Sequence, residues 1–280
     1  MNNTTKAMPR IAPDSSLFSR ESMNLASPNA VTAVRIFVWR TWKHTSNNLF
    51  AYGMDVVLAP VLTLLIFTYL FGGAIAGSTT AYLQYFLPGF LLLTILPMTV
   101  YSGTTLCQDI VKGVYNRFRT MPFWQPATMI GSVLMDGLRY MSAALVSFGV
   151  GMLLGFRPEG GAIGAIMALL FIVCFAFSVS WIFSMMGVLV KKPETVSGTS
   201  MMLMYPLLFA SNILVDSDTM PGWMGVIVEL NPISVAATTA RGLMHGTAST
   251  GDIAAGVGVC LLLLLLFMPL TIYFYMKKVK

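Results

Sequence analysis

The sequence predicts an all-α polytopic membrane protein with six transmembrane helices, an N-terminal amphipathic interfacial helix and an outer re-entrant hairpin between spans five and six. Of its 280 residues, 56% are hydrophobic and only 10% are charged, whereas soluble domains carry roughly 25% charged residues. The apolar runs are long and continuous, which favours spanning helices. Basic residues gather at the ends of these runs. These observations together predict the fold class.

The chain divides into a polar tail, residues 1–29, and a transmembrane domain, residues 30–280. The tail is rich in Ser, Asn and Pro and has no signal-peptide pattern, which predicts a flexible cytoplasmic segment. Residues 31–52 then carry apolar side chains on one helical face and basic ones on the other. This pattern is typical of a helix lying in the plane of the membrane surface and contacting lipid. Its interfacial residues would be Trp39, Arg40, Trp42 and Lys43.

Six apolar runs approach the length of about 20 residues that crosses a bilayer. Two prolines inside the second run predict a kink. In the third run Ala143, Ser147, Gly151 and Gly155 recur every four residues, and such a small-residue stripe lets another helix approach closely. The predicted spans are about 54–75, 83–106, 128–156, 162–190, 196–215 and 253–276.

The stretch after the fifth span predicts a hairpin that dips back into the membrane. Its apolar pieces are too short to cross a bilayer, yet too apolar for an aqueous loop. Irregular backbone at membrane depth is tolerated only when it is buried in protein or lines a watery path. The alternative is an interfacial loop anchored by Trp223. The residues that mark the hairpin are Pro221, Gly222, Trp223, Asn231 and Pro232.

Two ionisable residues, Asp136 and Arg139, lie inside the third span. They are three residues apart and therefore share one helical face. Charged groups inside a span are energetically costly and usually pair or line a cavity. An intramembrane ion pair between them is the simplest interpretation, and a substrate site is the alternative.

Residues 108–125 form a polar, basic segment with one apolar stripe. At 1.5 Å per residue this segment is long enough for about three helical turns. Two interpretations stay open: a second interfacial helix that is exposed to a partner, or an ordinary basic loop that fixes topology.

The distribution of positive charge predicts the orientation of the chain. Fourteen of the 17 Lys and Arg residues fall in the N-terminal segment, the loops after spans two and four, and the C-terminus. Cytoplasmic loops carry such an excess, so both termini are predicted to be cytoplasmic, and the hairpin to face out. The net charge of +6 therefore reflects topology and not a nucleic-acid partner.

Several chemistries lack their residues in this sequence. No Gly-rich phosphate loop ending in Lys-Ser or Lys-Thr is present, so the chain shows no means of hydrolysing a nucleotide. Cys107, Cys174 and Cys260 have neither metal nor redox spacing and are interpreted as buried thiols. His44 and His245 fall on opposite predicted sides of the membrane, so no metal site is expected from them.

From about residue 30 onward the chain resembles the membrane subunit of type-2 ABC exporters, in particular the daunorubicin-resistance permease group. Four pieces occur in the family's order. They are Asp109 with Arg117-Phe118-Arg119-Thr120-Met121-Pro122; Asp136-Gly137-Leu138-Arg139; Lys192-Pro193-Glu194-Thr195-Val196; and the hairpin region with Pro206 to Asn212, Thr219 to Trp223, Asn231 to Ser234 and Ala240 to Leu243. The first piece departs from the common family form, because Lys112, Gly113 and Asn116 stand where acidic residues are frequent.

The resemblance implies a permease subunit in a bacterial plasma membrane that exports a hydrophobic drug, toxin or lipid-like molecule. No cofactor is expected on this chain. It would pair with a second permease, identical or paralogous, and dock a separate cytoplasmic ATPase that binds ATP and Mg²⁺. The outer hairpins would gate release. The ATPase-coupling residues would be Asp109, Lys112, Val114, Arg117, Phe118 and Arg119.

The competing interpretation is a secondary transporter or channel driven by an ion gradient. That class needs titratable groups at mid-membrane, and only Asp136 qualifies at depth. Internal inverted repeats, which would also favour that class, are not visible in the sequence.

Overall fold

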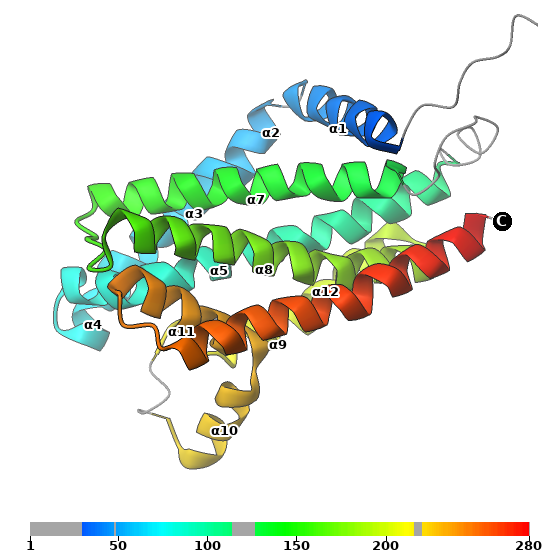
Figure 1. The fold of residues 1–280 in the computed structure, drawn as a ribbon. Coiled ribbons are helices and arrows are strands. Elements are labelled where there is room, and N and C mark those ends of the chain that lie inside the picture. Colours follow the sequence, from blue (N-terminus) through cyan, green and yellow to red (C-terminus); the bar gives the residue numbers. More distant parts are fainter. Residues whose placement is uncertain (1–29, 48, 114–126, 216–219, 280) are drawn as a thin grey trace, which may run out of the picture.

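The computed structural model describes residues 30–47, 49–113, 127–215 and 220–279. The predicted tail, residues 1–29, and residues 114–126 lie outside the described part. Figure 1 shows a bundle of helices that run side by side, with a short helical hairpin at one end. The helices are α1 (Ala30–Ser46), α2 (Leu49–Gly53), α3 (Ala59–Ile66), α4 (Gly72–Ala76), α5 (Thr79–Val111), α7 (Ala127–Leu153), α8 (Gly161–Leu189), α9 (Pro193–Phe209), α10 (Gly222–Leu230), α11 (Pro232–His245) and α12 (Thr250–Val279), with π-helical turns η3 (Met54–Leu58) and η4 (Phe67–Phe71).

Five helical stretches within the described residues are long and apolar enough to cross a membrane. They confirm an all-helical, multi-span membrane fold and overlap five of the six predicted spans. The remaining predicted span, 196–215, corresponds to α9, which has 17 residues and ends at Phe209. The five stretches are Leu49–Ile75, Thr79–Val111, Met129–Leu153, Gly161–Leu189 and Thr250–Lys278.

The first of these stretches alternates between short α-helical pieces and two π-helical turns, η3 and η4. Such turns widen the backbone locally and are frequent at functional sites. The first one carries Asp55, whose carboxylate meets a neighbouring helix.

The central helix of the bundle is α5, which packs against α7, α8, α9 and α11. In its most apolar stretch 72% of the residues are buried, against 11% in α12, so α12 lies at the edge of the bundle. Helices α5 and α8 approach each other closely at Gly103 and Gly187. A Cβ atom on either glycine would overlap backbone atoms of the other helix. Small residues at such crossings let two membrane helices pack backbone to backbone.

The predicted small-residue stripe on the third span does contact a neighbouring helix. Ala143 and Ser147 are fully buried, and a Cβ atom on Gly151 would overlap the side chain of Leu87 on α5. The stripe ends there, because Gly155 lies beyond α7 with a positive φ of 109° and no atoms near its Cβ direction.

The glycine contact between α5 and α8 leads to a prediction about stability. Gly187→Ala is expected to destabilise the protein by about 1–3 kcal/mol, since the methyl group would force the two helices apart. Gly149→Ala is the matched control, because its Cβ would meet nothing within 4 Å. The measurement is the thermal unfolding midpoint of each purified variant in detergent. Equal midpoints for both variants would contradict the close packing.

Candidate functional site

The hairpin after α9 is a pair of helices, α10 and α11. Helix α11 packs against α5, α8 and α12 and buries Ala236, Ala237 and Ala240 completely or nearly so. Helix α10 is mostly exposed, and 68% of the Trp223 side chain is accessible at its beginning. The described residues thus form a helical hairpin in which one helix is embedded in the bundle and the other stands outside it (Figure 1).

Asn231 joins the hairpin to the end of α9. Its side-chain nitrogen donates to the carbonyl oxygens of Leu207 at 2.6 Å and Ala210 at 2.7 Å. Its side-chain oxygen accepts from the backbone N–H of Ile233 at 2.9 Å and caps α11. Pro232 then occupies the first turn, where a missing N–H has no cost. These contacts explain why α9 ends before residue 215: the carbonyls at its end are bound by a side chain from the hairpin.

Arg241, on the embedded helix α11, holds the same end of the bundle together. Its guanidinium donates to the backbone oxygens of Tyr85 at 3.2 Å and Asn212 at 2.9 Å. It also stacks on the Tyr85 ring, 3.8 Å from the ring centroid. The Tyr85 hydroxyl donates to the same Asn212 oxygen at 3.0 Å. Sequence reasoning gave Arg241 no site role, because backbone carbonyls from two distant segments leave no signal in the sequence.

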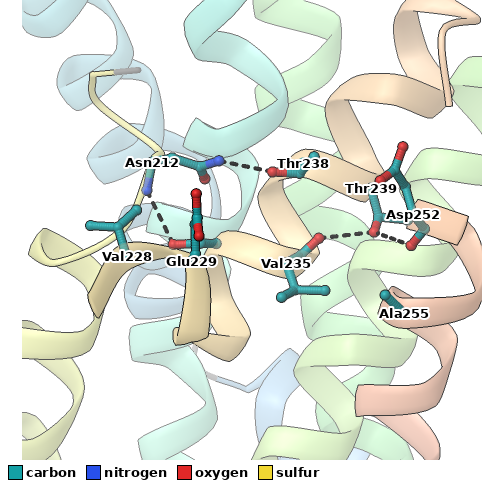
Figure 2. A pocket seen from close by; sticks show the side chains of 9 residues that line it. Asn212, Val228, Glu229, Val235, Thr238, Thr239, Asp252 and Ala255 are labelled. Atoms are coloured by element: carbon teal, nitrogen blue, oxygen red, sulfur yellow. Dashed lines mark hydrogen bonds between the residues drawn. The ribbon is translucent and has the colours of Figure 1, made fainter. Parts of the chain in front are cut away.

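A pocket of about 210 Å³, lined by both polar and apolar side chains, opens beside this network. Figure 2 shows Asn212, Glu229 and Asp252 around it, from the turn after α9, from α10 and from α12. The Asn212 amide donates to the Thr238 hydroxyl at 2.8 Å, and the Thr239 hydroxyl bonds the Asp252 backbone oxygen at 2.9 Å. Within the described residues no group of three or more His, Cys, Asp or Glu side chains is arranged to hold a metal ion.

The intramembrane ion pair differs from the predicted one. Arg139 pairs with Asp55 in η3, on another span, and not with Asp136. The spacing places Asp136 and Arg139 on one face, but each is drawn to a different neighbour. Asp136 accepts a hydrogen bond from Ser102 on α5 at 2.6 Å, and that hydroxyl also contacts Tyr140 at 2.9 Å.

This polar cluster therefore links three spans, since Ser102 comes from α5, Asp136 and Arg139 from α7, and Asp55 from η3. The Arg139 guanidinium also lies over the Tyr101 ring, 4.8 Å from its centroid. Polar contacts between membrane helices contribute modestly each, about 0.6–2 kcal/mol. A cluster of them fixes how the three helices face one another.

The proposed ATPase-coupling segment is only partly described. Asp109 lies in the last turn of α5, and Lys112 is exposed just after it. Gly113 then adopts a positive φ of 65°, which turns the chain away from the helix axis. Val114, Arg117, Phe118 and Arg119 lie outside the described residues, so the coupling role stays a prediction.

The N-terminal helix forms as predicted, as α1, and it packs against α7. The Trp39 and Trp42 side chains are more than half exposed. Lys43 lies over the Trp39 ring, 5.4 Å from its centroid. Indole rings with a basic group above them suit a membrane surface, and the interfacial location of Trp39, Arg40, Trp42 and Lys43 stays a prediction.

A bundle of membrane-length helices with a helical hairpin packed into one end defines an all-helical, multi-span membrane protein. Residues 32–245 match the ABC-2 type transporter family. The chain belongs to this family as a permease subunit, and in such transporters ATP is hydrolysed by a separate ATPase subunit with which the permease works.

Three relatives span most of the chain or a large part of it. The chain is 51% identical over 256 residues to the daunorubicin resistance ABC transporter permease protein DrrB1 of Streptomyces coeruleorubidus. The aligned region covers 90% of this chain and 89% of that protein. It is 22% identical over 244 residues to the probable doxorubicin resistance permease DrrC of Mycobacterium tuberculosis, 83% of this chain and 88% of that protein. It is 26% identical over 184 residues to the putative transport permease ycf38 of Cyanophora paradoxa, 64% and 62% of the two chains.

Mutations can distinguish the observed pair of Arg139 with Asp55 from the pair of Arg139 with Asp136 that the spacing predicts. Asp55→Asn leaves Arg139 without its charged partner at membrane depth and is expected to lower the yield of folded protein several-fold. Asp136→Asn, the control, keeps an oxygen that can accept from Ser102 and should have a smaller effect.

The double change Asp55→Asn with Arg139→Gln is expected to recover part of the loss, since both charges are then removed together. The measurement is the monodisperse fraction after detergent extraction. A larger loss for Asp136→Asn than for Asp55→Asn would contradict this pairing.

Proposed function

We propose that this chain forms the membrane pathway of a drug exporter. It would carry a hydrophobic drug, toxin or lipid-like molecule out of the cytoplasm or the inner leaflet, driven by ATP and Mg²⁺ on the separate ATPase subunit. The observation that carries the proposal is the 51% identity, across 90% of the chain, to a permease named for daunorubicin resistance. The large apolar surfaces of the bundle suit such a substrate.

The proposed topology has six spans with both termini on the cytoplasmic side of a bacterial plasma membrane. Helix α9 would supply the sixth crossing, since about 17 residues is the lower limit for a span. Its beginning follows the end of α8, and its end is tied to the beginning of α5 through Tyr85 and Asn212. These two contacts support a path for α9 from the end of α8 toward the beginning of α5.

The basic segments gather at one end of the bundle, which supports this orientation. Lys278, near the C-terminus, donates to the carbonyl oxygen of Val190 after α8 at 3.5 Å. The Cys107 thiol, near the end of α5, lies 3.5 Å from the same oxygen. By the excess of Lys and Arg in cytoplasmic loops, this end would be cytoplasmic and the hairpin end outer.

The remaining parts of the proposal concern partners. A second permease, identical or paralogous, would pair with this one, and the hairpin residues Pro221, Gly222, Trp223, Asn231 and Pro232 would gate release at the outer end. The ATPase would dock on residues 108–122 and on α1. The apolar exposed face of α10 is consistent with a part that contacts lipid or a moving partner.

The proposed function is tested by accumulation of daunorubicin, which is itself fluorescent, in a drug-sensitive bacterial host. Co-expression of the chain with its ATPase subunit is expected to lower accumulation several-fold. Each subunit alone, or the chain with an ATPase variant that cannot hydrolyse ATP, should leave accumulation unchanged. Efflux by the chain alone that survives ATP depletion but collapses with a proton uncoupler would favour the secondary transporter instead.

Coupling through residues 108–122 gives a separate prediction. Reversing Arg117 and Arg119 to Glu is expected to lower the amount of ATPase that copurifies with the permease by several-fold, because the basic surface offered to the partner changes sign. The matched control is Lys191→Glu with Lys192→Glu, the same change of charge in the loop before α9.

Membrane insertion is measured in the same preparations, and it should persist in both variants, since the other positive residues still fix topology. Unchanged copurification and unchanged efflux in the Arg117 and Arg119 variant would mean that this segment only fixes topology.

A further inference from the structure

The last turns of α8 and α12 enclose a small hollow at the basic end of the bundle. Its volume is about 190 Å³, and it is lined by three apolar residues, Val188, Leu189 and Phe274, and by two lysines, Lys277 and Lys278. No Asp or Glu of the described residues lines it. The hollow therefore joins an apolar wall to a positively charged rim.

Lys278 holds one side of this hollow in place. Its ammonium group donates to the carbonyl oxygens of Val188, in the last turn of α8, and of Val190, just after it. The final carbonyls of a helix have no partner within the helix, and a cation beside them is favourable. Lys278 thus joins the end of α12 to the end of α8, and no carboxylate of the described residues forms an ion pair with it.

The charges around the hollow are mostly positive. Lys277 is exposed and has no hydrogen bond or ion pair within the described part of the chain. Lys191-Lys192, which follow the end of α8, are exposed as well, and Glu194 comes next in the first turn of α9. The end of α5 adds one charge of each sign, from Asp109 and Lys112. An anionic ligand would lower the repulsion among these lysines.

The hollow lies at the level expected for lipid head groups. Helix α12 has 30 residues and is therefore about 45 Å long, whereas the hydrocarbon core of a bilayer is about 30 Å thick. Tyr273, one turn before the two lysines, is 61% exposed, and tyrosines are enriched at the membrane surface. Figure 1 shows α12 along the edge of the bundle, and only 11% of its most apolar stretch is buried. A lipid molecule can therefore reach the hollow.

We propose that this hollow binds the phosphate group of an anionic phospholipid, with Lys277 as the charged partner and an acyl chain against Leu189 and Phe274. The three donors of an ammonium group match the oxygens of a phosphate, and basic pockets between membrane helices are typical sites for anionic head groups. The lipid stays bound to the protein and is distinct from the transported molecule. It would stabilise α12, which has few other contacts outside α8 and α11.

The test titrates the purified full chain in dodecyl maltoside with dioleoyl phosphatidylglycerol, dioleoyl phosphatidylcholine or inorganic phosphate. The two lipids have the same acyl chains, but only phosphatidylglycerol has a net negative charge. Bound lipid is counted by native mass spectrometry, and stability is followed by the thermal unfolding midpoint. Phosphatidylglycerol is expected to bind several-fold more tightly than phosphatidylcholine and to raise the midpoint further.

Lys277→Gln is expected to weaken phosphatidylglycerol binding about fivefold, the contribution of one lysine near an anionic lipid, and to leave phosphatidylcholine binding unchanged. Lys112→Gln is the matched control, because it removes an exposed lysine after α5 that does not line the hollow. Leu189→Asn makes the apolar wall polar and is expected to weaken the binding of both lipids.

Three results would overturn the inference. The first is equal affinity of the wild-type chain for the two lipids, or an equal loss in Lys277→Gln and Lys112→Gln. The second is displacement of phosphatidylglycerol by inorganic phosphate at similar concentration, which would make the hollow a site for a free anion. The third is a Lys277→Gln variant that copurifies with less ATPase but binds lipid normally, which would assign this lysine to the partner subunit.

Discussion

The structure depends on how the broken backbone after α9 is satisfied. In a bilayer every backbone N–H and C=O must be bonded within the protein, and the end of a helix leaves four carbonyls without partners. Here Asn231 covers the carbonyls of Leu207 in the last turn and of Ala210 just after the helix, and Arg241 covers the carbonyl of Asn212. Both side chains come from the hairpin that follows. The hairpin therefore supplies the groups that cap the end of α9. If the embedded helix α11 moved out of the bundle, those carbonyls would lose their hydrogen bonds.

The rest of the bundle is also held by a small number of close contacts and hydrogen bonds. Apolar side chains gain little by leaving lipid for protein, so close packing and a few polar contacts decide how membrane helices associate. Helix α5 uses both. Gly103 lets it meet α8 backbone to backbone, and the neighbouring Ser102 bonds Asp136 on α7. Two consecutive residues thus orient α5 toward two different helices.

The sequence predicts features that depend on adjacent residues, and it misses contacts between residues that are far apart in the chain. Five of the six spans predicted from hydropathy coincide with helices long enough to cross a membrane, because each is a long apolar run. Asn231-Pro232 marks the beginning of α11 because that signal is contained in two adjacent residues. The predicted ion pair named Asp136 as the partner of Arg139, and the structure places Asp55 there instead. Helical spacing could not predict this contact, because Asp55 is 84 residues from Arg139 and lies in a π-helical turn of another span. Arg241 was missed because its partners are backbone atoms, which every residue carries.

Helix α9 connects the two ends of the bundle to which the proposals refer. It begins next to the basic loop of Lys191 and Lys192 and ends at Phe209. Asn212, in the turn that follows, is bonded to the hairpin and lines the pocket. A helix is stiff along its axis, so a displacement at its beginning is carried to its end. Because the end of α9 is bonded to Asn231, such a displacement must either move the hairpin with it or break the bonds that cap the helix.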